Sequence, residues 1–164
     1  MQPQSPPIPP TQSIRHGALT LSLPMGWEDR SQVIAVAPEV DGFRSSLVVS
    51  VEPVTSSETA ARLAARMLSN TQRVAPGFIL VSERDAIFGG NKGFLREYSV
   101  LLQGQRVSQL QFYTVKESVG FTFTYTQRED LLVRTRSVAE TAFASAQLGM
   151  PDTEAVKRLG FIRS

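Results

Sequence analysis

The chain has 164 residues and a mass of 18.0 kDa, of which 41% are hydrophobic and 20% charged, so its size and balance fit one soluble globular domain. It contains no cysteine and a single histidine, His16, which excludes disulfides, thiolate metal sites and cysteine nucleophiles and leaves little for triad chemistry. The formal net charge of +2 is too small for the clustered basic face that nucleic-acid binding needs. We therefore expect a binding protein that is not an enzyme and holds no metal or cofactor.

The N-terminal segment is rich in proline and lacks both a basic start and the apolar run of an export signal. Proline has no backbone donor and favours an extended, solvated chain, so we predict a disordered flank over 1–14. One domain over 15–149 and a short tail over 150–164 follow. Without an export signal, we expect a cytoplasmic protein. No apolar run approaches the roughly 18 residues that span a bilayer, so we do not expect the protein to insert into the membrane.

Three strands are predicted in the first third of the domain. Leucines at alternate positions predict a half-buried strand over 18–23. Two β-branched runs, over 33–37 and 46–52, each end at a proline and predict the next two strands. Consecutive strands joined by short turns favour antiparallel neighbours.

The pattern then changes to a helical period. A capping box of Thr55 with Glu58 predicts a helix over 56–71, and a second box beginning at Thr126 predicts a helix over 129–148. Each predicted helix has one apolar stripe, and the sheet is the surface available to bury it.

Four further strands are predicted between the helices, over 78–88, 93–103, 105–117 and 119–126. The run Gly89–Gly93 (GGNKG) resembles a phosphate-binding loop superficially, but strand patterns flank it on both sides, so it predicts a hairpin turn. The element order predicts an α+β fold, with an antiparallel sheet of about six to seven strands and two helices packed on one face.

Strand alternation also assigns residues to the face that these helices leave open. Leu47, Val49, Leu110 and Phe112 suit the core, and Ile34 and its row join the open face if Val33 points inward. The residues expected on the open face are uncharged: Ile34, Val36, Ser46, Val48, Ser50, Val107, Gln109, Gln111 and Tyr113. Two interpretations fit them: an ordinary solvated sheet face, or a groove for an apolar partner that still carries some hydrogen-bonding groups.

A family resemblance lies in three segments, over 23–31 (LPMGWEDRS), 46–50 (SLVVS) and 104–113 (GQRVSQLQFY). These segments resemble the DcrB-related family and, within it, the Eag-type chaperones of type VI secretion effectors. The likeness spans residues 18–148. It implies a PsbP-like fold, in which a curved antiparallel sheet carries helices on its convex side.

The resemblance also implies a function and a site. Eag-type chaperones are homodimers that shield the N-terminal transmembrane segments of a secreted effector before it is loaded for export. In their groove, a serine, an aliphatic residue and a serine alternate on one strand, a pattern that Ser46, Val48 and Ser50 match. Glutamines alternate on another strand, where Gln109 and Gln111 match.

Aliphatic residues on an earlier strand complete that groove in the family. Ile34 and Val36 match them, whereas a one-residue register slip would substitute Val33 and Ala35. The alternative function is a DcrB-related structural or adaptor module that binds a folded protein through its sheet face.

Overall fold

The computed structural model describes residues 10–16 and 18–148, which divide into two compact units. The described part of the first unit is an antiparallel hairpin of β1 (Thr11–His16) and β2 (Leu19–Pro24), in which Ile14 lies opposite Leu21. Residues 11–14, which we expected in the disordered flank, instead belong to β1. They are ordered as a strand because they pair with the alternating leucine strand β2. Residues 1–9 of the flank and the tail over 150–164 lie outside the described residues.

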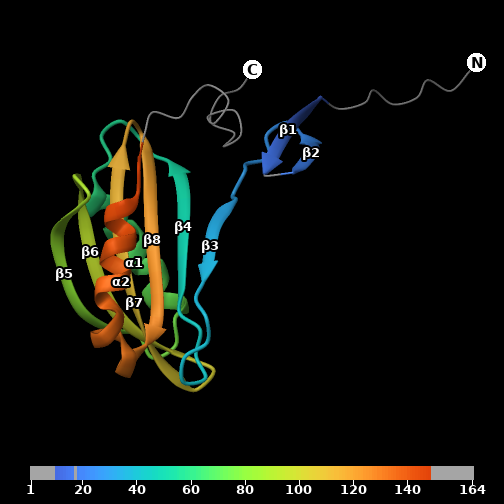
Figure 1. The fold of residues 1–164 in the computed structure, drawn as a ribbon. Coiled ribbons are helices and arrows are strands. Elements are labelled where there is room, and N and C mark those ends of the chain that lie inside the picture. The colour runs from blue at the N-terminus through green and yellow to red at the C-terminus, as the bar shows by residue number, and fades with distance from the viewer. Residues whose placement is uncertain (1–9, 17, 149–164) are drawn as a thin grey trace, which may run out of the picture. The chain divides into compact units, whose positions relative to one another are not determined.

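The second unit holds a six-stranded sheet whose neighbouring strands are all antiparallel, in the order β3-β4-β8-β7-β6-β5 (Figure 1). This sheet confirms the predicted α+β class. Its strands are β3 (Gln32–Val36), β4 (Ser46–Pro53), β5 (Ile79–Phe88), β6 (Asn91–Leu102), β7 (Gln105–Lys116) and β8 (Val119–Arg128).

The glycine-rich run between β5 and β6 is a hairpin turn, as predicted. Phe88 pairs with Asn91, and the two residues between them are Gly89 with φ 59° and Gly90 with φ 83°. Two-residue hairpin turns with positive φ at both positions match the twist of the flanking strands and favour glycine.

The helices begin later than the capping boxes predicted. Thr59, not Thr55, caps the first helix, and its Oγ1 accepts a hydrogen bond from the Arg62 amide at 3.2 Å. Thr126 pairs with Ser46 inside β8, so it cannot cap the second helix. The helices are α1 (Ala60–Val74), a 3-10 turn η1 (Glu129–Leu131) and α2 (Leu132–Ser145). Within the two described ranges, no helix is long and apolar enough to cross a membrane.

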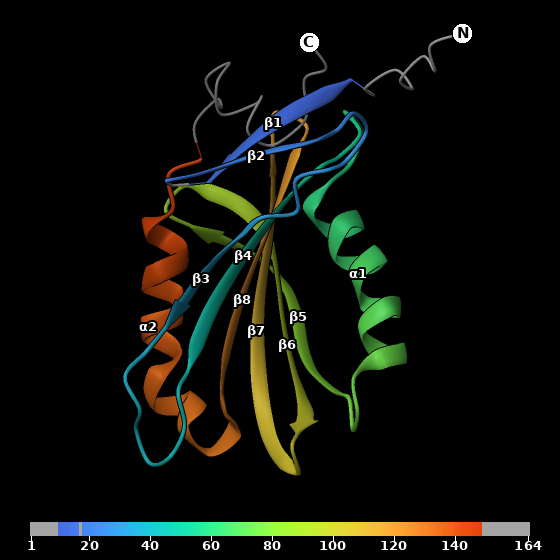
Figure 2. The same ribbon diagram turned by 90° about the vertical axis from the view of Figure 1, so that its right-hand side faces the viewer.

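The two helices pack on opposite faces of the sheet (Figure 2). Leu110 and Phe112 of β7 share a buried cluster with Phe143 of α2, whereas Tyr113 of β7 shares a second cluster with Leu63 of α1. Successive residues of a strand point to opposite faces, so the prediction that both helices pack on one face is wrong. Both rows of β7 carry large buried side chains, and each row needs its own cover.

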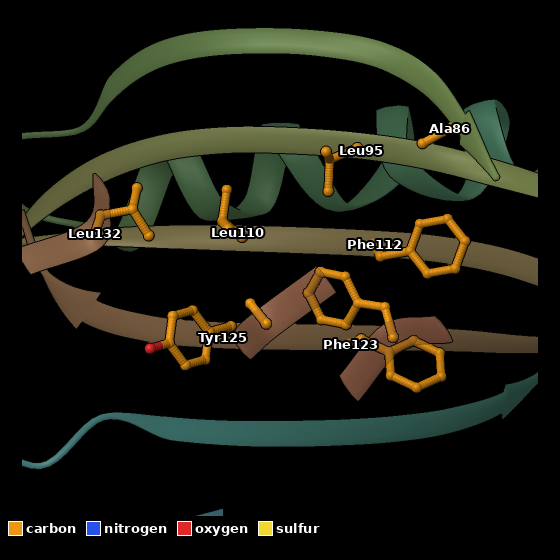
Figure 3. Packing of buried hydrophobic residues seen from close by; sticks show 9 residues of the cluster. Ala86, Leu95, Leu110, Phe112, Phe123, Tyr125 and Leu132 are labelled. Atoms are coloured by element: carbon orange, nitrogen blue, oxygen red, sulfur yellow. The ribbon is translucent and has the colours of Figure 1, made fainter. Parts of the chain in front are cut away.

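The core on the α2 face is built around phenylalanine rings. Phe112 stacks on Phe143 with a centroid distance of 5.8 Å, and Phe88 meets Phe112 edge-on at 4.9 Å. Figure 3 shows Phe112, Phe123 and Tyr125 gathered with their neighbours from adjacent strands. This packing fixes the register of the central strands, because a one-residue slip would turn the whole row to the other face.

A substitution in α1 tests whether that helix covers the second face. Leu63 is fully buried, so Leu63→Ala should lower the free energy of unfolding by about 2–5 kcal/mol in urea denaturation. The matched control is Val74→Ala in the same helix, whose side chain is 64% exposed and whose loss should cost no more than about 0.5 kcal/mol. Equal effects of the two substitutions would contradict the packing of α1.

Candidate functional site

The strand register brings the predicted site residues to one face of the sheet. Ile34 lies opposite Val48, Val48 opposite Thr124, and Thr124 opposite Gln111, so one row crosses β3, β4, β8 and β7. Directly paired residues of antiparallel strands project on the same side. The adjacent row crosses the same four strands and consists of Val36, Ser46, Thr126 and Gln109, each paired with the next.

The register also decides between the two alignments of β3. Val33 pairs with Val49, which packs against the core cluster on the α2 face. Ile34 and Val36 therefore lie on the same face as Gln109 and Gln111.

Two of the predicted residues are not accessible. Tyr113 is 0% exposed beneath α1, and Val107 is 1% exposed in a cluster with Tyr98 and Val100. Tyr113 was assigned to an open surface because α1 was expected on the other face, whereas Val107 is covered by Phe43, Ala75 and Phe78, which the strand pattern does not place there. The structure makes both residues part of the core.

The accessible remainder is a continuous uncharged surface, which we call the glutamine surface. Ile34 and Val36 on the edge strand are 63% and 49% exposed, and the other members are half-buried. Thr124 and Thr126 join it although sequence reasoning missed them; they occupy the polar row of the alternating strand β8, a pattern that could have revealed them. The members are Ile34, Val36, Ser46, Val48, Ser50, Gln109, Gln111, Thr124 and Thr126.

The position of α1 leaves this surface free. Gly120 of β8 has no side chain, and a Cβ there would lie 3.0 Å from both Leu63 and Val54, so α1 can approach the sheet closely at that point. Arg66 of α1 also forms an ion pair with Glu52 of β4 at 3.3 Å. Along its length α1 packs chiefly on β6 and β7, so α1 itself leaves most of β3, β4 and β8 uncovered on this face.

A chain of hydrogen bonds runs from the core to Gln111. Arg96 is 2% exposed; its Nη1 donates to the Ala64 carbonyl at 2.8 Å and to the Tyr113 hydroxyl at 3.1 Å. Tyr113 donates to Gln111 Oε1, and Gln111 Nε2 donates to Thr124 Oγ1 at 3.1 Å. The amide of Gln111 is therefore held at both ends.

A parallel chain holds Gln109. The Tyr98 hydroxyl donates to Gln109 Oε1, and Gln109 Nε2 donates to Thr126 Oγ1 at 3.0 Å. In the part of the chain that the structure describes, no buried side-chain nitrogen or oxygen lacks a hydrogen-bond partner. Each glutamine keeps one N–H outside these bonds, because its amide nitrogen carries two.

Both tyrosines are kept neutral. Burial raises the pKa of Tyr113 to about 12, against the opposing effect of Arg96 beside it. Burial also raises the pKa of Tyr98, well above its ordinary range. Each hydroxyl therefore retains its proton near neutral pH and donates it to a glutamine.

Two cavities of the structure are further candidate sites. A cavity of about 220 Å³ lies on the α2 face, lined in part by Ala35, Leu47 and Val138. A larger hollow of about 710 Å³ lies beside Thr59 and Ile87, near the start of α1. Among the described residues, no three histidine, aspartate or glutamate side chains are placed to hold a metal ion.

The fold and the site define a small α+β domain in which one helix packs on each face of the sheet and part of the α1 face is left open. The DcrB family model matches residues 19–145, so the chain belongs to the DcrB family. No curated protein matches the chain.

The chain is also similar to solved structures. A protein of unknown function from Pseudomonas aeruginosa, PA94, is 21% identical with a TM-score of 0.67; the match covers 85% of this chain and 98% of that one. This similarity shows a shared fold. The cyanobacterial PsbP protein (CyanoP) from Synechocystis sp. PCC 6803 is 17% identical with a TM-score of 0.49, over 85% of this chain and 92% of that one.

Because the pKa of Tyr113 is raised in the folded state, the free energy of unfolding should fall as the pH rises above 10. An unfolded tyrosine ionises near pH 10.0 and the folded one near 12, so the folded state holds its proton longer as pH rises. The stabilisation is complete below pH 10 and is lost between about pH 10 and 12, at up to about 1.4 kcal/mol per pH unit. Denaturation series should show a shallower decline for Tyr113→Phe than for the wild type. Identical declines would contradict the burial of a neutral hydroxyl.

Proposed function

We propose that this protein is a cytoplasmic, non-enzymatic chaperone that binds and shields the N-terminal transmembrane segments of a type VI secretion effector before export. The glutamine surface is the binding site. The observation that carries the proposal is an open sheet face that combines exposed aliphatic side chains with glutamine amides held by hydrogen bonds at both ends.

The aliphatic part supplies the affinity. A transmembrane helix needs about 20 apolar residues, and its exposure to water costs roughly 25 cal/mol per Å². Ile34 and Val36 are the most exposed members of the surface, with half-buried Val48 beside them. Four strands spaced about 4.8 Å apart span about 14 Å, which is wide enough for one helix of about 10 Å diameter.

The polar residues of the surface can form hydrogen bonds with the polar side chains that transmembrane helices contain. Transmembrane helices pack through small residues and bond through serine, threonine and other polar side chains. Gln109 and Gln111 offer the same kind of partner from the sheet. The mixture also suits a chaperone, which must release its client, because a wholly apolar surface would hold the helix more tightly.

The surface carries no formal charge among its members, which supports an apolar client over a charged one. The alternative, an adaptor that binds a folded protein through the same face, differs in what it recognises. It would bind a folded partner and leave isolated apolar helices insoluble.

Neighbouring residues of β3 provide a matched test. Ile34 and Val33 are each 63% exposed, but they project to opposite faces. When the chain is co-expressed with the N-terminal apolar segments of a candidate effector, the wild type should keep those segments soluble. Ile34→Asp should abolish the effect because it places a charge against the helix, whereas Val33→Asp should preserve it.

Loss of solubility with both substitutions, or with neither, would contradict binding at the glutamine surface. The circular-dichroism melting curves of the two variants should coincide. This control separates a binding defect from a folding defect.

The proposal includes a homodimer. β3 is an edge strand of the described sheet, with one hydrogen-bonding side free of a strand partner, and free edges favour association. Sedimentation equilibrium should give twice the chain mass of 18.0 kDa. A mass equal to one chain at micromolar concentration would overturn this part of the proposal.

A further inference from the structure

We propose that Arg96 is a positioning residue that fixes the hydrogen-bond polarity of the glutamine surface, so that Gln111 and Thr124 present donors. The surface then selects oxygen acceptors, namely hydroxyl and backbone carbonyl oxygens, on the helix it binds. This inference rests on the proposed function and names the chemistry that the site recognises in its client.

The first step is the donor-only chemistry of arginine. A guanidinium has no acceptor and stays protonated in proteins. Because Arg96 Nη1 donates to the Tyr113 hydroxyl at 3.1 Å, that oxygen is an acceptor, and its own proton must point elsewhere. It points to Gln111 Oε1. The cation therefore sets the direction of the next bond.

The direction of the Tyr113 bond also sets the direction of the bond between Gln111 and Thr124. Once Gln111 Oε1 accepts from Tyr113, the amide nitrogen must face Thr124, where it donates to Oγ1 at 3.1 Å. The hydroxyl oxygen of Thr124 is then an acceptor, which leaves its proton for a partner. The second N–H of Gln111 is likewise left. Both residues are half-buried on the glutamine surface, so each is partly exposed to a helix bound there.

The surroundings of Arg96 hold it in place. Its Nε pairs with Glu83 at 2.9 Å, and its guanidinium carbon lies 5.3 Å from the ring centroid of Tyr113 and 5.8 Å from that of Phe94. Arg96 does not belong to the glutamine surface, so it acts through Tyr113.

The neighbouring row provides an internal comparison. Gln109 is held by Tyr98 and Thr126, but among the described residues no guanidinium donates to the Tyr98 hydroxyl. A flipped Gln109 amide would satisfy the same partners, with Thr126 donating and Tyr98 accepting. Only the Gln111 row has a direction imposed by a charge.

The test uses Tyr113→Phe, which removes the connecting hydroxyl and keeps the ring, and Tyr98→Phe as its matched control. The first readout is nuclear magnetic resonance of the glutamine side-chain amides in the free protein. Tyr113→Phe and Arg96→Met should each release the Gln111 amide, with lower order parameters and faster exchange. The Gln109 amide should stay unchanged in both variants.

The second readout is binding to a carrier protein fused to a 20-residue leucine and alanine helix, with or without two central serines one turn apart. Wild-type protein should prefer the serine helix by about tenfold, the effect of one or two hydrogen bonds. Tyr113→Phe should remove most of this preference, and Tyr98→Phe should retain most of it.

The outcomes are separable. An unchanged Gln111 amide in a folded Arg96→Met variant, or in Tyr113→Phe, would overturn the positioning role of Arg96. Equal loss of serine preference in the two tyrosine variants would overturn the imposed polarity. If no apolar helix binds while the Gln111 amide responds as expected, the proposed function fails and the positioning role stands.

Discussion

One helix on each face cannot cover a six-stranded sheet, and the candidate site follows from this constraint. Six strands spaced about 4.8 Å apart are about 24 Å wide, whereas a helix is about 10–12 Å across. Because α1 packs chiefly on β6 and β7, much of its face over β3, β4 and β8 stays open. The uncovered part includes the glutamine surface, whose members combine uncharged polar side chains with aliphatic ones, and this mixture makes it a candidate for recognition.

The covered and open parts of this face are linked by shared hydrogen bonds. Arg96 bonds to a carbonyl of α1 and to Tyr113, and Tyr113 in turn bonds to Gln111 on the open surface. The groups that hold the helix therefore also orient an amide of the surface. A substitution beneath α1 is therefore expected to alter binding even when every residue of the glutamine surface is unchanged. For each such variant, the loss of binding must be compared with the loss in free energy of unfolding.

Local patterns predicted much of the fold but not its layers. Alternation located the strands and placed Ile34, Val48 and Gln111 on one face, because period two is a property of each strand alone. It did not show which face α1 covers, since that depends on packing between distant segments, and so Tyr113 was assigned to the open surface. The capping box at Thr126 failed for a similar reason: pairing with β4 extended the strand through it.

Photo-crosslinking from β3 tests the central claim, that an apolar helix binds at the glutamine surface, most directly. A photoreactive amino acid placed at position 34 or at position 33 samples opposite faces from equally exposed sites. In cells that express a candidate effector, crosslinks from position 34 should map to its apolar N-terminal segments, and position 33 should give few. Crosslinks to those segments from position 33 alone, or from neither position, would contradict the claim.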